Sequence, residues 1–315
     1  KGLLYKGYKI LPWCPRDMTG LSSHEVGQGY LEVEDPALTV AFKLQGHDQT
    51  YALAWTTTPW TLLSNMALVV GPEIDYVFAR RAGDENTYVL AKARLRPVLG
   101  EKGVEVLREV KGKELVGTSY ERLFDYYGPL DGPAHRVVPG DFVTTSDGTG
   151  IVHAAPAFGE DDYRVCRENG LAFVNLVEPT GRFTAACGPF AGRWVKEADG
   201  DIARDLKRRG HLLKQERYKH EYPHCWRCKT PLLYYAREAW YIATTKVKDR
   251  LVALNQEIAW FPEHIRDGRF GDFLANNKDW ALSRERYWGT PLPVWECTAD
   301  GCTGRVVVDS VAALR

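Results

Sequence analysis

Short apolar segments, each four or five residues long, recur between turn residues through the middle of this 315-residue chain. They are Thr39-Val40-Ala41-Phe42, Ala67-Leu68-Val69-Val70, Tyr76-Val77-Phe78-Ala79, Thr87-Tyr88-Val89-Leu90, Val104-Glu105-Val106-Leu107 and Phe173-Val174-Asn175-Leu176-Val177. Turn pairs such as Gly71-Pro72, Gly128-Pro129 and Gly188-Pro189 separate many of them. Runs this short, bounded by turn residues, are typical of β-strands. Their succession predicts a β-barrel-like domain over residues 36–215.

Two helices are expected inside this β domain, and further helices after it. Residues 160–169 end at Gly170 and residues 202–209 end at Gly210, which suits helices because glycine commonly follows a last turn. Beyond the β domain, residues 239–255 and 266–277 carry apolar side chains at helical spacing. The chain is therefore predicted to be an α+β protein whose segment 236–315 is mainly helical.

Charge and hydropathy limit the environment and the partners of the chain. It carries 41 basic and 41 acidic residues, so contact with nucleic acid requires a local basic patch rather than an overall positive field. No run reaches the roughly 18 apolar residues of a membrane span, and the first residues lack the apolar core of a signal peptide. A cytoplasmic protein without a membrane partner is predicted. Neither end resembles a natural terminus, which suggests an excised segment.

The seven cysteines favour reduced thiols and metal binding over a disulfide framework, because their number is odd and they include close pairs. Cys14 lies three residues before Asp17, and Cys225 and Cys228 form a Cys-x-x-Cys pair. If these two corners meet across the β domain, they supply four ligands for a tetrahedral structural zinc. Residues 1–35 and 216–235 are thus predicted to be the two halves of a zinc ribbon.

Other readings of these residues stay open. Cys14 could be an ordinary buried thiol, and the pair Cys225 and Cys228 a redox pair or a metal-free turn. Cys297 and Cys302 could belong to a second metal site or complete one with Cys225 and Cys228. The fourth ligand could also be a histidine, with the candidates His24, His220 and His224.

A predicted strand that ends in three hydroxyl residues lies near the start of the β domain. Residues 51–55 alternate large side chains with alanine, which is typical of a half-buried strand, and Pro59 stops the ladder because it has no N–H. Thr56, Thr57 and Thr58 would stand at the end of this strand, where hydroxyls can contact a ligand. Threonine is also an ordinary strand residue, so the triplet alone decides little.

Three longer motifs resemble isoleucyl-tRNA synthetases. The string Thr56-Thr57-Thr58-Pro59-Trp60-Thr61-Leu62, with Ser64-Asn65 behind it, is similar to the editing-domain signature of that family. His153-Ala154-Ala155-Pro156, continuing to Gly159 and Asp162, is similar to its motif His-x-Ala-Pro-x-x-Gly-x-x-Asp. The segment 279–293, which contains Gly289-Thr290-Pro291, is similar to the return into the catalytic domain. The resemblance covers essentially the whole chain and implies a piece of such an enzyme.

Two details bear on this resemblance. Valyl and leucyl synthetases also resemble the chain, but they carry Arg-Pro after their threonines, where this chain has Thr58-Pro59-Trp60. In the family, the position of Asp17 is often a second cysteine. Asp17 as a zinc ligand is therefore a departure from the family pattern.

The resemblance implies an error-correcting hydrolase. A hydrophobic pocket gains little from the single methylene that distinguishes isoleucine from valine, so a second, smaller pocket is expected to admit valine, exclude isoleucine and hydrolyse valyl-tRNA(Ile). The implied partners are the acceptor end of tRNA(Ile) carrying valine and the remainder of the synthetase chain. A monomer is expected, and the hydrolysis needs no cofactor.

The matched motifs imply a role for each residue of that pocket. Thr56, Thr57 and Thr58 are the catalytic candidates, because hydroxyls can position water and the ester although none is a strong base. Asp162 would bind the substrate ammonium from the first turn of a helix, where the backbone dipole favours an ionised carboxylate. The other substrate-binding candidates are His153 in the pocket wall, Trp60 near the adenosine or the wall, and Asn65.

Sequence signatures for other chemistry are absent. His-Ile-Gly-His and Lys-Met-Ser-Lys-Ser do not occur, so ATP is expected to be used only by the full enzyme and not by this piece. Two alternatives to the editing function are a valyl-type editing domain, which would prefer threonine, and a non-catalytic zinc-stabilised tRNA-binding module. The second would use a basic face made of Arg204, Lys207, Arg208, Arg209 and the run 214–219.

Overall fold

A computed structural model describes residues 2–283 and 292–315. They form two compact units, one of residues 9–237 and one of residues 1–8 with 238–315. Strands β1 (Leu4–Cys14) and β12 (Leu233–Ile242) pass from one unit into the other. The threonine, histidine and aspartate motifs and the cysteine corners at residues 14 and 225 all belong to the larger unit.

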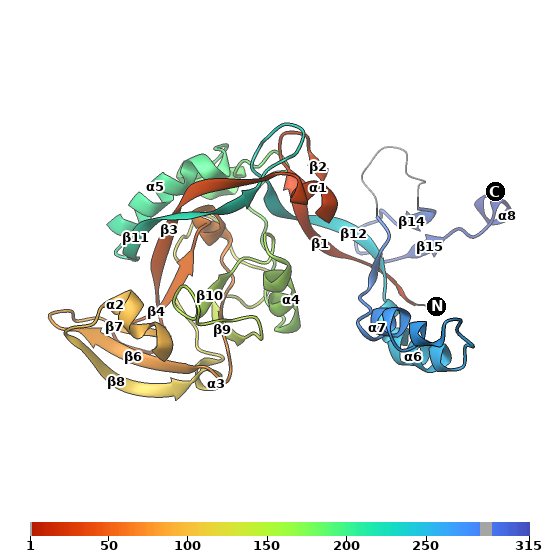
Figure 1. Cartoon of the computed structure of the whole chain (residues 1–315). Coiled ribbons are helices and arrows are strands. Elements are labelled where there is room, and N and C mark those ends of the chain that lie inside the picture. Colours follow the sequence, from red (N-terminus) through yellow and green to blue (C-terminus); the bar gives the residue numbers. More distant parts are fainter. Residues whose placement is uncertain (1, 284–291) are drawn as a thin grey trace. The chain divides into compact units, whose positions relative to one another are not determined.

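The larger unit is built on a six-stranded sheet (Figure 1). Its neighbours are antiparallel except β4 and β7, which are parallel. The longest pairing joins β11 to β3 and runs from Leu212 opposite Val40 to Pro223 opposite Tyr30. In spatial order the strands are β11 (Leu212–Pro223), β3 (Tyr30–Lys43), β4 (Thr50–Thr56), β7 (Thr87–Ala91), β6 (Asp75–Arg81) and β8 (Val104–Lys111).

A three-stranded sheet lies beside it in the same unit. Its order is β10 (Ile151–Ala154), β5 (Ala67–Val70) and β9 (Arg136–Pro139). β10 is antiparallel to β5, with His153 opposite Leu68, while β5 and β9 are parallel. The Ala91 N–H donates to the Thr149 carbonyl at 2.9 Å, which ties the end of β7 to the segment that leads into β10.

Both sheets are open over the described ranges 2–283 and 292–315, since the ladders end at β11 and β8 in one and at β10 and β9 in the other. The predicted combination of strands and helices is confirmed. The strands between residues 30 and 223 form two open sheets, however, and not a cylinder closed by hydrogen bonds.

Helix α5 (Val195–Arg208) packs on β3, on β11 and on the short 3-10 helix η1 (Pro59–Ser64). It begins seven residues before the predicted start at residue 202, because Val195, Ala198 and Ile202 already form a buried apolar stripe at helical spacing. β4 is also covered more fully than predicted, since its alanines are buried as well as Leu53. Strand β4, which leads to the threonine motif, is thus largely buried within the larger unit.

The remaining helices of the larger unit are short, and α4 is the one that matters for the site. It covers Glu160–Glu168, in agreement with the prediction of a helix over 160–169. The others are α1 (Ser23–Gly27), η2 (Lys92–Arg94), α2 (Leu95–Leu99), α3 (Gly112–Leu115) and η3 (Ala185–Phe190); β2 (Thr19–Gly20) pairs with the end of β1.

The predicted strand over residues 173–177 is wrong. The segment contributes one isolated bridge, between Val177 and Phe183. Its backbone groups have other partners: the Val177 N–H donates to Asn175 Oδ1 at 3.1 Å, and the Val177 carbonyl accepts from Tyr235 Oη at 2.7 Å. Side chains that bind the backbone in this way compete with a strand ladder.

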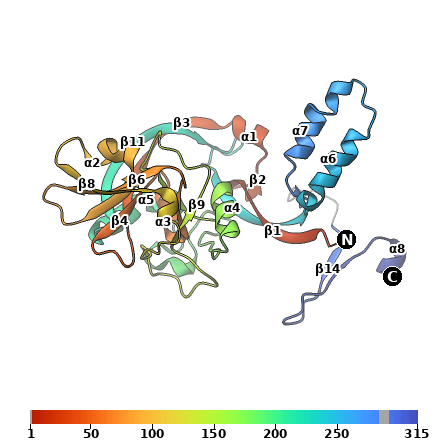
Figure 2. The same cartoon turned by 90° about the horizontal axis from the view of Figure 1, so that it is seen from below.

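The smaller unit contains two helices that lie side by side, α6 (Lys248–Gln256) and α7 (Arg269–Ala275) (Figures 1 and 2). The helix predicted from residue 239 begins later, because the run Trp240-Tyr241-Ile242 has side chains that favour strands and continues β12. The other elements are η4 (Thr244–Val247), η5 (Glu263–Ile265), β13 (Trp280–Ala281), β14 (Val294–Glu296), β15 (Arg305–Val307) and α8 (Val311–Leu314).

The segment 279–293 was predicted to be the return into the catalytic domain, and its residues 284–291 lie outside the described residues. In the part of the chain that is described, every helix is too short or too polar to span a membrane.

Candidate functional site

A cavity of about 340 Å³ lies between the threonine motif and the histidine and aspartate motif of the larger unit. Two stretches that are distant in sequence therefore meet at one place. The lining residues are Trp55, Thr56, Thr57, Thr58, Thr61, Phe142, Thr144, Asp147, Gly148, Thr149, Gly150, Ile151, Val152, His153, Phe158 and Asp162.

The predicted threonines line one wall of this cavity, and the hydroxyls of Thr56 and Thr58 are linked. Thr56 Oγ1 accepts from the Thr58 N–H at 3.1 Å and lies 3.2 Å from Thr58 Oγ1. Thr58 Oγ1 lies 3.2 Å from the hydroxyl of Thr61, one turn further along η1. Pro59 suits the first position of η1, since its fixed φ is helical and its missing N–H needs no partner there. The strand therefore ends in a tight turn that presents several hydroxyls to the cavity.

His153 lies in the cavity wall with both ring nitrogens engaged, and its side chain is buried. Nε2 lies 2.8 Å from Thr61 Oγ1, and Nδ1 lies 3.1 Å from Asn65 Nδ2. Burial lowers the pKa of His153 to about 4, because the charged ring would be poorly solvated. The imidazole is neutral at physiological pH.

Two backbone carbonyls determine where the His153 proton lies, because a carbonyl can only accept a hydrogen bond. Asn65 Nδ2 donates to the Ala67 carbonyl at 2.9 Å, so the amide turns its N–H group toward His153 Nδ1, which must accept. Thr61 Oγ1 donates to the Thr58 carbonyl at 2.8 Å and must therefore accept from His153 Nε2. The neutral ring carries its proton on Nε2 and has no free nitrogen with which to remove a proton from water.

Asn65 and Trp60 do not line the cavity. Asn65 stands behind His153, and its Oδ1 accepts from the buried Tyr120 hydroxyl at 2.6 Å. Trp60 packs edge-on against Phe158, which does line the cavity, with ring centroids 4.8 Å apart. Both residues therefore touch lining residues and not the cavity itself.

Asp162 lines the cavity from the first turn of α4, and its Oδ2 accepts from the Ala155 N–H at 2.9 Å. Burial raises the pKa of Asp162 to about 7, while the bond from Ala155 opposes this rise. Neutral pH therefore leaves the carboxyl divided between its two forms, because burial opposes the helix dipole, which favours the ionised form. A Cβ at Gly159 would come within 2.7 Å of Asp162 Cγ, so glycine is needed there to admit the carboxylate.

Several site residues were not assigned a role from the sequence. Thr61 had a signal, since it lies three residues after Thr58 within the matched motif and so on the same face of one helical turn. Tyr120, which holds the Asn65 amide, belongs to no motif. Phe142, Thr144 and Asp147 come from an irregular loop whose path the residue pattern does not predict.

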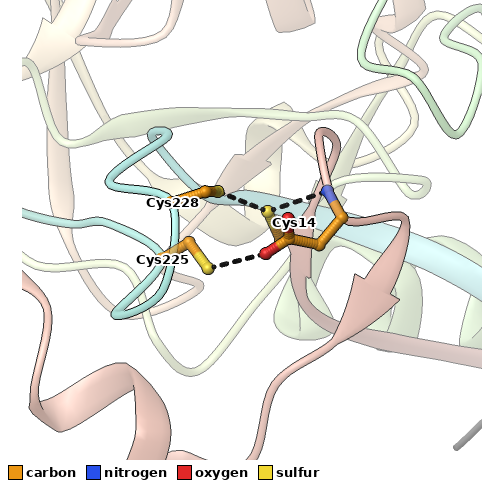
Figure 3. A group of neighbouring side chains, drawn as sticks. Cys14, Cys225 and Cys228 are labelled. Atoms are coloured by element: carbon orange, nitrogen blue, oxygen red, sulfur yellow. Dashed lines mark hydrogen bonds between the residues drawn. The ribbon is translucent and has the colours of Figure 1, made fainter.

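A second group of polar side chains brings the two predicted cysteine corners together (Figure 3). Cys14 Sγ lies 3.4 Å from Cys228 Sγ, and Cys225 Sγ lies 3.2 Å from Asp17 Oδ2. All four ligand atoms lie within 4.8 Å of one another. Three thiols and a carboxylate at these separations could hold a metal ion at their centre.

The rival ligands have other partners or lie elsewhere. His24 Nε2 lies 2.9 Å from Gln28 Nε2, His220 Nε2 lies 3.2 Å from Asp35, and His224 Nδ1 lies 2.9 Å from the Tyr222 carbonyl. Cys297 and Cys302 are exposed and belong to the smaller unit. Among the residues that the structure describes, the four-residue group is the one with metal-binding geometry.

The basic face proposed for RNA contact is largely paired with acidic residues. Five of its seven basic side chains form ion pairs, which reduces the local positive field. The pairs are Arg204 with Asp201, Arg208 and Arg209 with Asp205, Lys214 with Glu216, and Arg217 with Glu34.

Comparison with known proteins places the chain in a family. The sequence profile described as "tRNA synthetases class I (I, L, M and V)" matches residues 1–313. The chain belongs to the class I tRNA synthetases. This synthetase chain is 50% identical over 315 residues to the isoleucine–tRNA ligase of Clostridium acetobutylicum and 47% identical to that of Clostridium tetani. The predicted resemblance to isoleucyl-tRNA synthetases is confirmed.

The synthetase chain is shorter than these relatives. Each match covers 100% of the chain and 30% of the relative. A crystal structure of the P. knowlesi cytosolic leucyl-tRNA synthetase editing domain is similar to the chain with a TM-score of 0.45 and 14% identity, and the match covers 61% of this chain and 99% of that one.

Proposed function

We propose that the chain carries the editing centre of an isoleucine–tRNA ligase and hydrolyses valyl-tRNA(Ile). The observation that carries this proposal is the shared cavity, in which a half-buried carboxyl from α4 and the threonine hydroxyls at the end of β4 and in the turn into η1 line the same small space. An aminoacyl ester presents an ammonium, a carbonyl and a ribose. Each of these groups has a complementary group in the cavity lining.

Asp162 is proposed to bind the substrate ammonium. It is buried enough for its pKa to rise to about 7, and an ammonium beside it would favour the ionised carboxylate. Asp147 also lines the cavity, but it is exposed, where water weakens such an interaction. The half-buried carboxyl of Asp162 is therefore the better anchor, and the exposed Asp147 offers a matched comparison.

His153 is proposed to exclude isoleucine by occupying space. Its ring is held on both sides by Asn65 and Thr61, so it cannot move aside without losing two hydrogen bonds. A rigid wall rejects the larger side chain by steric conflict rather than by weaker attraction. The engaged nitrogens also make His153 a poor general base.

The chemistry is proposed to be attack by a positioned water. The water oxygen forms a bond to the ester carbonyl carbon, the bond from that carbon to the ribose oxygen breaks, and the ribose oxygen takes a proton as valine leaves as the free acid. Thr56, Thr57 and Thr58 would hold the water and the developing oxyanion by hydrogen bonds. A covalent enzyme intermediate is not required.

The four-residue group is proposed to bind structural zinc through Cys14, Asp17, Cys225 and Cys228. The donor set fits zinc, which accepts thiolate and carboxylate in a tetrahedral arrangement. Bound zinc would hold the two corners of the ribbon together through its coordination bonds.

In the parent enzyme, residues 36–215 would be the editing insertion, 1–35 and 216–235 the ribbon that carries it, and 236–315 the return into the catalytic domain. The parent enzyme would use ATP through parts outside this chain and would act as a cytoplasmic monomer on tRNA(Ile). The paired basic face makes a purely RNA-binding role the weaker alternative. A valyl-type editing domain differs in the ester that it prefers.

The first prediction concerns the substrate. Given valyl-tRNA(Ile) and isoleucyl-tRNA(Ile) separately, the chain should hydrolyse the valyl ester at least tenfold faster, because the wall at His153 excludes the extra methylene. Release of the labelled amino acid measures both rates. Equal rates would contradict the pocket, and a preference for threonyl-tRNA(Val) would favour the valyl-type alternative.

The second prediction concerns Asp162. Asp162→Ala removes a charge-assisted contact of roughly 1.5–3 kcal/mol, so kcat/KM for the valyl ester should fall about ten- to a hundredfold. Asp147→Ala should change it less than about threefold, because Asp147 is exposed. Steady-state measurement of kcat/KM for both variants tests this difference.

The same carboxyl predicts a pH dependence. Its pKa of about 7 lies above the ordinary range, so the ionised form that binds ammonium accumulates as pH rises through 7. After subtraction of uncatalysed hydrolysis, kcat/KM should rise from pH 6 to pH 8. Asp162→Asn, which keeps an oxygen for the Ala155 N–H, should remove this rise. An unchanged profile in that variant would assign the pH dependence to another group.

The third prediction separates size exclusion from chemistry. His153→Ala should open the wall and allow isoleucyl-tRNA(Ile) to be hydrolysed, while hydrolysis of the valyl ester continues. Thermal melting of the variant controls for the loss of the bonds to Asn65 and Thr61. A folded variant that hydrolyses neither ester would make His153 a catalytic residue.

The fourth prediction concerns the metal. Elemental analysis should find about one zinc per chain, and Cys225→Ala should retain much less because the loss of one thiolate weakens a four-ligand structural site. Cys187→Ala is the matched control, since Cys187 is a buried thiol outside the cluster. Equal zinc content in both variants, or no zinc in the unsubstituted protein, would overturn the assignment.

A further inference from the structure

The buried carboxyl of Asp199 on α5 touches the turn that carries the threonines, although 139 residues separate the two partners in sequence. Its Oδ1 accepts a hydrogen bond of 2.9 Å from the backbone N–H of Trp60, and the residue is 4% exposed. Asp199 does not line the cavity. Neither the threonine motif nor the histidine motif contains it.

The Trp60 N–H is the donor at this turn that needs an outside partner. The first N–H groups of a helix have no carbonyl within the helix to bind. Here Pro59 has no N–H, and the Thr61 N–H is satisfied within the turn by the Thr58 carbonyl at 3.0 Å. Trp60 therefore relies on a group from another element, and Asp199 supplies it.

The position of Asp199 is itself held by a neighbouring ion pair. Lys196, one turn earlier on α5, donates to Asp35 Oδ2 on β3 at 2.8 Å, and both side chains are mostly buried. The first turns of α5 are thus tied to the sheet and to the threonine turn at once. A shift of α5 would therefore move Trp60 through its hydrogen bond to Asp199. Movement of Trp60 would in turn move Phe158 in the cavity wall, because the two rings are in contact.

We propose that Asp199 is a positioning residue for the editing reaction, which holds the threonine turn through the Trp60 N–H. This inference rests on the proposed function, since the hydroxyls that it positions are those assigned to the attacking water. Asp199 acts through the backbone and touches no substrate.

The contact requires an oxygen acceptor and not a charge. Burial raises the pKa of Asp199 to about 8, so the carboxyl is largely neutral at pH 7 and still accepts from Trp60. Asparagine retains such an oxygen at the same position, whereas alanine retains none. The pair of variants Asp199→Asn and Asp199→Ala therefore isolates the hydrogen bond.

The test compares both variants with the exposed α5 variant Glu197→Ala, below the melting temperature of each. For valyl-tRNA(Ile), Asp199→Ala should lower kcat about tenfold with KM changed less than about threefold, because an unanchored turn misplaces the hydroxyls while Asp162 still binds the ammonium. Asp199→Asn should stay within about threefold of the unsubstituted protein. Glu197→Ala should be unchanged.

The rate of hydrogen exchange of the Trp60 backbone amide, measured by NMR, gives a readout that does not depend on activity. Exchange should become at least tenfold faster in Asp199→Ala and remain slow in Asp199→Asn. Unchanged Trp60 exchange, unchanged kcat in Asp199→Ala, or equal loss of activity in both Asp199 variants would overturn the proposal. If the unsubstituted protein hydrolyses no valyl ester, the proposed function fails and the catalytic role fails with it, whereas faster exchange in Asp199→Ala alone would still establish the anchor.

Discussion

The long antiparallel pairing of β3 with β11 is the contact on which the rest of the larger unit depends. It aligns residues 30–40 with residues 212–223, so a chain that has run through two sheets returns beside its own starting strand. The pairing continues past the strands, where the His224 N–H donates to the Gly29 carbonyl at 2.8 Å. A side chain at residue 29 would meet the His224 carbonyl at 1.9 Å, so this approach requires glycine. The cysteine corners meet next to this point, and α5 packs across both strands.

Two backbone carbonyls determine the hydrogen-bond directions in the polar wall of the cavity. Carbonyl groups at Ala67 and Thr58 stand at the two ends of a chain of side chains and determine the direction of every hydrogen bond between them. A buried ring with both nitrogens engaged is a rigid object, which suits exclusion by size better than proton transfer. The side of the cavity formed by α4 differs, because its carboxyl has a pKa near neutrality and can respond to a charged ligand.

The sequence predicted those features that local patterns encode. Short apolar runs marked most strands, glycine marked the ends of α4 and α5, and the spacing Cys-x-x-Cys together with Cys14 and Asp17 indicated a group that does assemble. The threonines, His153 and Asp162 lie around one cavity, as the matched motifs implied. The prediction of a strand at 173–177 was wrong because Asn175 and Tyr235 bind the backbone groups of Val177. Tyr235 lies 58 residues from Val177, and no local sequence pattern indicates so distant a partner.

Residues that act from a distance were beyond sequence reasoning for the same reason. Tyr120 and Asp199 reach the site through a single hydrogen bond each, and nothing around them in the chain distinguishes them from other buried polar side chains. Trp60 and Asn65 were found through their motif, yet their places behind the wall follow from packing that a motif does not describe.

Cys14 and Cys228 are 214 positions apart in sequence and meet in space. The larger unit is therefore a long loop whose two ends are held together at these residues, which form its neck. Closing so long a loop costs only slightly more conformational entropy than closing a shorter one, since the cost grows with the logarithm of the length. Paired strands and the four side chains that meet at the neck can offset that cost once for the whole unit. Such a body can be lengthened or trimmed at its surface loops during evolution while its two connections stay side by side. A closed neck therefore lets a folded unit be inserted into a longer chain with little demand on the fold of the rest.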